Sequence, residues 1–374
     1  METLTTPGRP AAIAVYMYRV CGAGGAERMA CWLAGALAEA GHPVRLVTLD
    51  APGVAPFYDH GDAALDQLSH DASPAGKLRR VWRLVRLFRA HGIRVLVGFL
   101  AGSDKTVLLA ARLAGVRAIA AERNSPAMYH LRHGRVARTM AFLQLRCFDH
   151  VTVQFPEFIG KYPAFLRSGI SAIGNPVFPV ADHRRHHEGG RRLLLSLGRI
   201  DEVQKRLSVL VDAFHRVAPT FPAWDLKIVG SGPDRARLEA QVAGLGLAGR
   251  IVLEPETPDP APLFDGADLF VIPSLWEGFP NALAESMAHG LPAAGFAGAD
   301  GVAHLIDDGE SGWLAPGSND PAALAVTLAA AMGDETERRR RGENARRAMA
   351  AFAPDRQLAA WHHLIEAVAE GRRP

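Results

Sequence analysis

Two glutamates eight residues apart, Glu277 and Glu285, are placed where side chains could bind a substrate. They follow the apolar run 269–272, and Pro280 between them suits the first turn of a helix. Glu277 is therefore expected in the loop before that helix and Glu285 inside it. Backbone N–H groups at a helix start favour an anion, whereas carboxylates accept hydrogen bonds from hydroxyls. The segment predicts a ligand that carries both phosphate and sugar hydroxyls.

Two cations precede this segment, next to the end of another apolar run. Arg199 follows the run 193–197, and Lys205 lies six residues further on. A strand-end arginine supplies a planar fork and a lysine a point charge, so the pair could close on a diphosphate from two sides. Two solvated charges on a loop are the alternative interpretation.

A glycine-rich turn at 21–27 follows the first apolar run and opens a helix. Its glycines, Gly24 and Gly25 among them, let a backbone approach a ligand, and the helix start favours an anion. The spacing is not that of the Gly-x-Gly-x-x-Gly dinucleotide motif. A tight turn that packs the helix on a sheet explains the glycines equally well.

The sequence predicts no metal and no other cofactor. It contains no Asp-x-Asp, the usual metal clamp on a nucleotide diphosphate, so Arg199, Lys205 and a helix start are expected to neutralise a leaving group. The three cysteines form no zinc pattern. His183, His186 and His187 could in principle ligate a metal, but a solvated linker is the preferred interpretation because spacing places no further ligand.

Short runs rich in Val, Ile and Leu alternate with segments of helical period, which predicts βαβ units. The predicted fold class is α/β, with two doubly wound Rossmann-like domains. The expected strands are 11–18, 44–49, 93–99, 116–120, 151–154, 171–174, 193–197, 226–229, 251–253, 269–272 and 292–295. The helices expected in the second half are 207–217, 235–245, 281–289 and 321–332, followed by an amphipathic helix at 357–369.

These motifs resemble those of glycosyltransferase family 4, a retaining, nucleotide-sugar-dependent group with the GT-B fold. The resemblance covers nearly the whole chain. It is carried by Gly24–Glu27, Glu122–Asn124, Asn175–Val177, Gly198–Lys205, Val229–Pro233, Glu277–Glu285 and Gly309–Leu314.

The resemblance implies two domains that face each other across a cleft and a C-terminal helix that crosses back to the first domain. The implied divisions are an acceptor-binding domain at 1–177, a linker at 178–192, a nucleotide-sugar-binding domain at 193–353 and the helix segment 354–374. The implied catalytic residues are Glu277, Arg199 and Lys205. The implied donor-binding residues are Gly24, Gly25, Arg199, Lys205, Gly230, Gly278, Phe279, Pro280, Asn281 and Glu285, with Glu277 on the transferred sugar and Glu285 on the ribose.

Retention of the anomeric configuration normally requires one of two routes. Either a carboxylate acts as nucleophile, or the leaving group departs and the acceptor attacks on the same face of the sugar. No residue suggests itself as a nucleophile, and the resemblance favours same-face substitution in which the diphosphate takes the acceptor proton. A UDP-sugar is the expected donor, although the segment 254–258, where relatives contact the base, is atypical.

Two further departures from the family pattern concern single residues. Arg206 follows the lysine where many relatives have glycine. Arg123 stands where many relatives have a histidine near the sugar, and His130 is close by in the sequence. Arg123 and His130 are therefore the acceptor-side candidates, with ordinary loop residues as the alternative.

Charge divides the chain into unlike halves. Residues 1–175 carry 21 Lys and Arg against 12 Asp and Glu, a net charge of +9, and the remainder carries −6. The segment 77–89 is expected as a helix with Arg79, Arg83 and Arg86 on one stripe and its apolar residues, Leu78, Val81, Trp82, Val85 and Phe88, opposite. Such a helix could lie on anionic lipid, helped by Arg132, Arg135, Arg138 and Arg146, or pack its apolar side on the sheet.

The predicted function is transfer of a sugar to a lipid-linked or polysaccharide acceptor in cell-envelope glycan synthesis. The expected location is cytoplasmic, at the inner face of the membrane, with no membrane span and no nucleic-acid partner. A nucleotide-sugar epimerase would need an acid/base arrangement that is not found, and a phosphorylase would need a longer chain. A non-catalytic nucleotide-sugar-binding protein is the remaining alternative.

Overall fold

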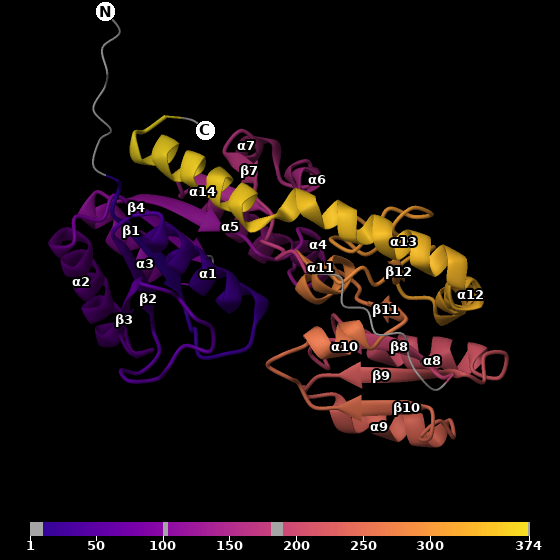
Figure 1. Ribbon diagram of the computed structural model, residues 1–374. Helices are drawn as coiled ribbons and strands as arrows, with labels where there is room; N and C mark the ends of the chain where they lie inside the picture. The colour runs from indigo at the N-terminus through magenta and orange to yellow at the C-terminus, as the bar shows by residue number, and fades with distance from the viewer. Residues whose placement is uncertain (1–9, 100–103, 181–189, 373–374) are drawn as a thin grey trace, which may run out of the picture. The chain divides into compact units, whose positions relative to one another are not determined.

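The computed structural model describes residues 10–99, 104–180 and 190–372, and the histidines of the 181–189 segment lie outside them. The chain forms two compact units (Figure 1). The N-terminal unit runs to Asn175 and includes the chain from Asp355 onward, and the C-terminal unit is Pro176–Pro354. Each unit contains a parallel sheet with helices, which confirms the predicted fold class.

The N-terminal sheet has seven parallel strands in the order β3-β2-β1-β4-β5-β6-β7. Ile13 of β1 pairs with Val44 of β2 on one side and with Val95 of β4 on the other, so the strand order reverses there. The strands are β1 Ile13–Met17, β2 Val44–Thr48, β3 Ala64–Gln67, β4 Val95–Phe99, β5 Arg117–Ala121, β6 His150–Val153 and β7 Ile170–Ala172.

The helices of this unit bury apolar stripes against the sheet. In α1, Met29, Leu33 and Leu37 recur every four residues and are all buried. The C-terminal helix α14 joins the same core, because Trp361, Leu364, Ile365 and Val368 cluster with side chains of β1 and β4. The helices are α1 Gly25–Glu39, α2 Pro74–Ala90, α3 Lys105–Ala114, α4 Ala127–Leu131, α5 Arg135–Leu145, α6 Pro156–Ile159, α7 Ala164–Arg167 and α14 Pro354–Ala369.

The C-terminal sheet has six parallel strands in the order β10-β9-β8-β11-β12-β13. Its strand order reverses between β8 and β11, which pair through Leu194 and Leu269. The strands are β8 Arg192–Leu197, β9 Trp224–Val229, β10 Ile251–Glu254, β11 Leu269–Val271, β12 Ala293–Phe296 and β13 Gly312–Ala315. The helices are α8 Leu207–Val217, α9 Arg235–Gly244, α10 Ala261–Asp265, α11 Asn281–Ala288, α12 Pro321–Gly333 and α13 Glu335–Ala348, and a short 3-10 helix, Met349–Phe352, follows.

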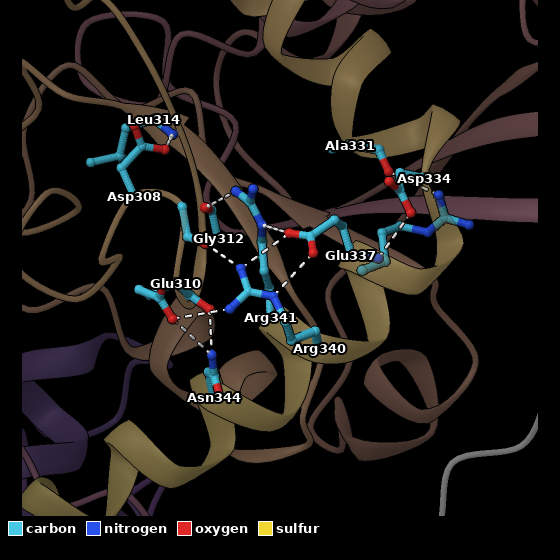
Figure 2. Close-up of polar contacts among 12 residues, drawn as sticks. Asp308, Glu310, Gly312, Leu314, Ala331, Asp334, Glu337, Arg340, Arg341 and Asn344 are labelled. Atoms are coloured by element: carbon cyan, nitrogen blue, oxygen red, sulfur yellow. Dashed lines mark hydrogen bonds and ion pairs between the residues drawn. The ribbon is translucent and has the colours of Figure 1, made fainter.

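Helix α13, absent from the sequence prediction, holds the glycine turn that precedes β13 (Figure 2). Arg341 donates to the carbonyl of Gly312 at 2.8 Å and lies over the Trp313 ring. Arg340 pairs with Glu310 of the turn at 3.0 Å. The Gly309–Leu314 motif is therefore a packing element in this structure, fastened by arginines of α13.

The predicted strands are present with ends shifted by at most two residues, but β3 and β13 were not predicted. The five apolar residues of 77–89 do not share one side of α2, contrary to the prediction: Val81, Val85 and Phe88 are buried, whereas Leu78 and Trp82 are 60% and 53% exposed. Arg80 takes a buried place instead, where it pairs with Asp104 at 3.1 Å. In the described part of the chain, no helix combines the length and the apolar character needed to cross a bilayer.

Candidate functional site

The predicted donor residues of the C-terminal unit follow three adjacent strands: Gly230 comes after β9, and the others come after β8 and β11, between which the strand order reverses. Gly198 and Arg199 follow β8, and the loop 272–280 follows β11 and leads into α11. Because β8 and β11 are parallel and adjacent, both loops leave the same edge of the sheet. Ligands of open α/β sheets bind outside the carboxyl ends of the strands at such a reversal.

The centre of this site is a contact between Lys205 and Glu277. The Lys205 Nζ donates to Glu277 Oε1 at 2.6 Å, and the Glu277 side chain is only 8% exposed. Ser274 Oγ donates to the same Oε1 at 2.7 Å, and Gln204 Nε2 lies 3.3 Å from Oε2. A buried carboxylate needs such a set of donors and a counter-charge to offset its lost hydration.

Two glycines let backbone segments approach at this edge. Gly230 packs so closely on the turn after β8 that a Cβ would lie 1.9 Å from the carbonyl oxygen of Gly198. Gly301 has φ of +80°, and its Cβ would lie 2.4 Å from the carbonyl oxygen of Glu277. The Glu277 backbone N–H also donates to the Asp300 carbonyl at 2.7 Å. The Glu277 backbone is thus fixed by the 300–301 turn.

Arg199 reaches outward from the same edge. Its side chain is 59% exposed and pairs with Asp201 at 2.9 Å. Asp201 in turn accepts the backbone N–H of Val203 and, through its carbonyl, that of Lys205. Arg199 and Lys205 therefore belong to one ordered loop, with Lys205 turned toward Glu277 and Arg199 toward solvent.

The loop after β11 enters α11 through Pro280, which is the N-cap rather than a first-turn residue. Asn281 begins the helix and Glu285 lies half-buried within it, as the spacing predicts. The Phe279 ring is buried and contacts the Phe352 ring edge-on, with 5.1 Å between centroids. Packing of Phe279 against the segment before Pro354 fixes the course of the Gly278–Pro280 turn.

Arg123, an acceptor-side candidate, is 8% exposed in the N-terminal unit. Its guanidinium donates to Ile173 O, Asn175 Oδ1 and Thr152 Oγ1. It also lies 5.4 Å from the Phe99 ring and 5.5 Å from the Trp361 ring, measured to the centroids. Burial lowers the pKa of Arg123 to about 10. The geometry gives Arg123 a packing role between the sheet and α14, and contact with an acceptor stays a prediction.

Its neighbour Glu122 is a buried carboxyl group of the same unit. Tyr129 OH donates to Glu122 Oε2 at 2.5 Å, and Gln154 Nε2 donates to the Glu122 carbonyl at 2.7 Å. Burial raises the pKa of Glu122, and the Tyr129 hydrogen bond opposes that shift. These contacts fix the turn after β5, in which Arg123 lies.

The other candidates of the N-terminal unit stand at helix ends. Gly24 is the N-cap of α1 and Gly25 its first residue, and the Glu27 carboxylate folds back so closely that a Cβ on Gly24 would lie 2.1 Å from it. His130 is exposed near the end of α4, where its Nδ1 lies 2.8 Å from Arg138 Nη1. Contact of Gly24, Gly25 or His130 with a ligand stays a prediction.

Sequence reasoning missed Ser274 and Gln204, which contact the Glu277 carboxylate. The available signal was their position: Gln204 directly precedes Lys205, and Ser274 lies three residues before Glu277. Among the described residues, no three His, Cys, Asp or Glu side chains gather as they would around a metal ion.

Two family models match the chain. The model for glycosyl transferases group 1 matches residues 181–348, and the glycosyl transferase 4-like domain matches residues 24–162. The chain belongs to the family 4 type of glycosyltransferase. The first match takes in the whole Gly198–Glu285 segment, and the second begins at Gly24.

Similar proteins support this family membership. A glycosyltransferase of Haemophilus influenzae is 25% identical over 82% of this chain and 86% of its own length. An exopolysaccharide phosphotransferase of Streptomyces coelicolor is 35% identical over 43% of this chain, a match that spans only 17% of that protein. Among solved structures, Anabaena HepE in complex with UDP and glucose has a TM-score of 0.81 at 16% identity, over 96% of this chain and all of that one. The fold of this family 4 chain is GT-B.

Proposed function

We propose that this family 4 chain is a retaining glycosyltransferase that moves a hexose from a UDP-sugar to a glycan or lipid-linked acceptor. The observation that supports it best is the Lys205–Glu277 contact at the strand reversal of the C-terminal sheet. This edge offers a cation for phosphate and a carboxylate for sugar hydroxyls within 2.6 Å of each other. A nucleotide sugar presents both kinds of group to a single site.

In the proposed reaction, the bond between the anomeric carbon and the diphosphate oxygen breaks, and the acceptor oxygen attacks from the same face. The acceptor proton passes to the departing diphosphate, so no enzymic nucleophile is required. Lys205 and Arg199 neutralise the growing charge on the leaving group, with the start of α11 as a further source of positive potential. Glu277 binds hydroxyls of the transferred sugar and Glu285 those of the ribose.

We propose the reaction as metal-independent, because Arg199 and Lys205 supply the charge that an aspartate-held metal would supply. The donor is proposed as a UDP-sugar, and the fold shared with HepE, which was solved with UDP, supports this choice. Gly278, Phe279, Pro280 and Asn281 would line the sugar and the phosphates. Gly24 and Gly25, at the start of α1, are also proposed as donor-binding residues.

The acceptor is proposed to be held by the N-terminal unit near an anionic membrane surface. The net charge of +9 over residues 1–175 supports this, as does the exposed pair Leu78 and Trp82 among arginines of α2. The Streptomyces relative is described as an exopolysaccharide enzyme, which supports a polysaccharide acceptor. The proposed location is the inner face of the cytoplasmic membrane, in cell-envelope glycan synthesis.

Thermal shift with a panel of nucleotide sugars identifies the donor, since a ligand in excess stabilises the folded chain by about RT ln(1 + [L]/Kd). Turnover of that donor is then measured with Glu277→Ala and Lys205→Ala. We expect each variant to lose at least about a hundredfold in kcat/KM, the usual scale for a lost charge-stabilising group. Because the reaction is proposed as metal-independent, turnover by the unmodified chain should not change when EDTA is added. Unchanged turnover in both variants would refute the proposed site.

A further inference from the structure

The two oxygens of the Glu277 carboxylate are unequally occupied. Oε1 accepts two short hydrogen bonds, from Lys205 at 2.6 Å and from Ser274 at 2.7 Å. Oε2 accepts one long contact, from Gln204 at 3.3 Å. An ionised carboxylate has about four lone-pair positions, two on each oxygen. Oε1 is therefore filled by the protein, and Oε2 has capacity for a hydroxyl of a ligand.

The donors around Glu277 differ in how firmly they are held. The Gln204 side chain also donates from Nε2 to the Trp276 carbonyl at 3.0 Å. The backbone carbonyl of Gln204 accepts from the backbone N–H of Leu275 at 2.8 Å. Ser274 has a short side chain and is fully buried. Lys205 carries its charge on a flexible four-carbon stem with three N–H donors. Of the three partners, Lys205 alone combines mobility with a charge that a diphosphate attracts.

We propose that Ser274 and Gln204 are positioning residues that hold Glu277, with Oε2 toward the transferred sugar, while Lys205 turns to the donor's phosphate. This inference rests on the proposed function. The diphosphate offers Lys205 more negative charge than one carboxylate does, so donor binding draws the ammonium away from Oε1. Ser274 and Gln204 then remain as the groups that compensate and orient the buried carboxylate.

The inference predicts different effects on turnover and on nucleotide binding. In Ser274→Ala and Gln204→Leu, the sugar-binding carboxylate loses its fixed orientation while Arg199 and Lys205 keep their hold on phosphate. We expect kcat for the donor that the panel identifies to fall roughly tenfold to a hundredfold, the usual cost of misplacing a catalytic contact. The Kd for UDP, measured by calorimetry, should stay within about threefold. Ser274→Thr, which keeps the hydroxyl, should restore most of kcat.

Two comparisons separate positioning from a general structural role. Ser286→Ala is the matched control, because Ser286 is also fully buried but donates only to Leu283 O within α11. It should leave kcat unchanged. In a Glu277→Gln background, Ser274→Ala should add less than about a twofold loss, because residues that act through one another are not additive.

The outcomes are distinguishable. Full kcat in both Ser274→Ala and Gln204→Leu, with an impaired Glu277→Gln, would overturn the positioning role and leave the proposed function standing. Full kcat in Glu277→Gln would instead overturn the proposed function of the site. UDP binding by each variant reports that its C-terminal unit is folded, and if one variant fails that check, the other still decides the question.

Discussion

At the scale of single residues, Arg206 is the clearest departure from ordinary backbone geometry. It has φ of +52° at the N-cap of α8, and Ser69 is the only other non-glycine residue with positive φ in the described ranges. A left-handed conformation costs an L-residue about 1–2 kcal/mol. Arg206 also occupies the position at which the family pattern has glycine in many relatives. The strain lies directly beside Lys205.

We predict that Arg206→Gly is more stable than Arg206→Ala by about 1 kcal/mol in the free energy of unfolding, because both variants lose the side chain and only glycine loses the strain. Urea unfolding of the two variants measures this difference. Equal stabilities, or a more stable alanine variant, would show that the left-handed geometry relaxes at no cost.

The residue types of the candidate site could be predicted, but their partners could not. Glu277 and Lys205 follow from the order of strand, loop, proline and helix, and their 2.6 Å contact connects residues 72 positions apart. The only sequence signal of Ser274 is its position three residues before Glu277, which does not predict that its hydroxyl contacts the carboxylate. For Arg123, the family resemblance suggested an acceptor-side contact, which stays a prediction, but the sequence did not predict its burial between the Phe99 and Trp361 rings.

At the scale of elements, predictability followed hydrophobic periodicity. Helix α8, with seven buried residues in eleven, has the predicted bounds 207–217. Helix α13 has no apolar stripe, because its buried positions are Arg338, Gly342 and Ala345, and Arg338 stacks on the Trp224 ring. A pattern search cannot recognise an arginine as a core residue. Strand β3, at the sheet edge, escaped prediction because it is only partly buried.

Helix α2 includes the predicted segment 77–89, but two large apolar side chains lie on its exposed side. Its Leu78 and Trp82, one turn apart, are exposed beside the exposed Arg79 and Arg83. Helix α3, against which α2 packs, exposes Leu109 and Leu113 as well. Exposed apolar side chains among arginines fit an anionic bilayer surface better than they fit water.

We predict that Trp82→Ser weakens binding to anionic phospholipid vesicles roughly tenfold. A tenfold loss corresponds to about 1.4 kcal/mol, the scale of burying one large apolar side chain. Vesicle sedimentation measures the binding, which should fall further at high salt. Phe57→Ser removes an exposed aromatic residue outside α2 and α3 and is the control. Equal binding of the unmodified chain to neutral and anionic vesicles would contradict the electrostatic part of the argument.

At the scale of the whole molecule, the two units share a sheet topology but differ in which parts of the chain complete their cores. Each sheet reverses its strand order once, between β1 and β4 or between β8 and β11, and the strongest candidate residues follow the second reversal. The C-terminal unit closes within one stretch of chain, whereas the N-terminal unit needs the returning helix α14 for its core. The last residues of the chain are thus a condition for the stability of its first 175.

Trp361 tests that condition, because it is fully buried on α14 and contacts Phe99 and Arg123. Its Nε1 has no hydrogen-bond partner, so its contribution comes from packing and from the Arg123 guanidinium over its ring. We predict that Trp361→Ala lowers the free energy of unfolding by about 3–5 kcal/mol and that Trp361→Phe costs much less. Urea unfolding followed by circular dichroism measures both, with the exposed Trp82→Ala as control. If Trp361→Ala and Trp82→Ala cost the same, α14 is not part of the core on which the N-terminal unit depends.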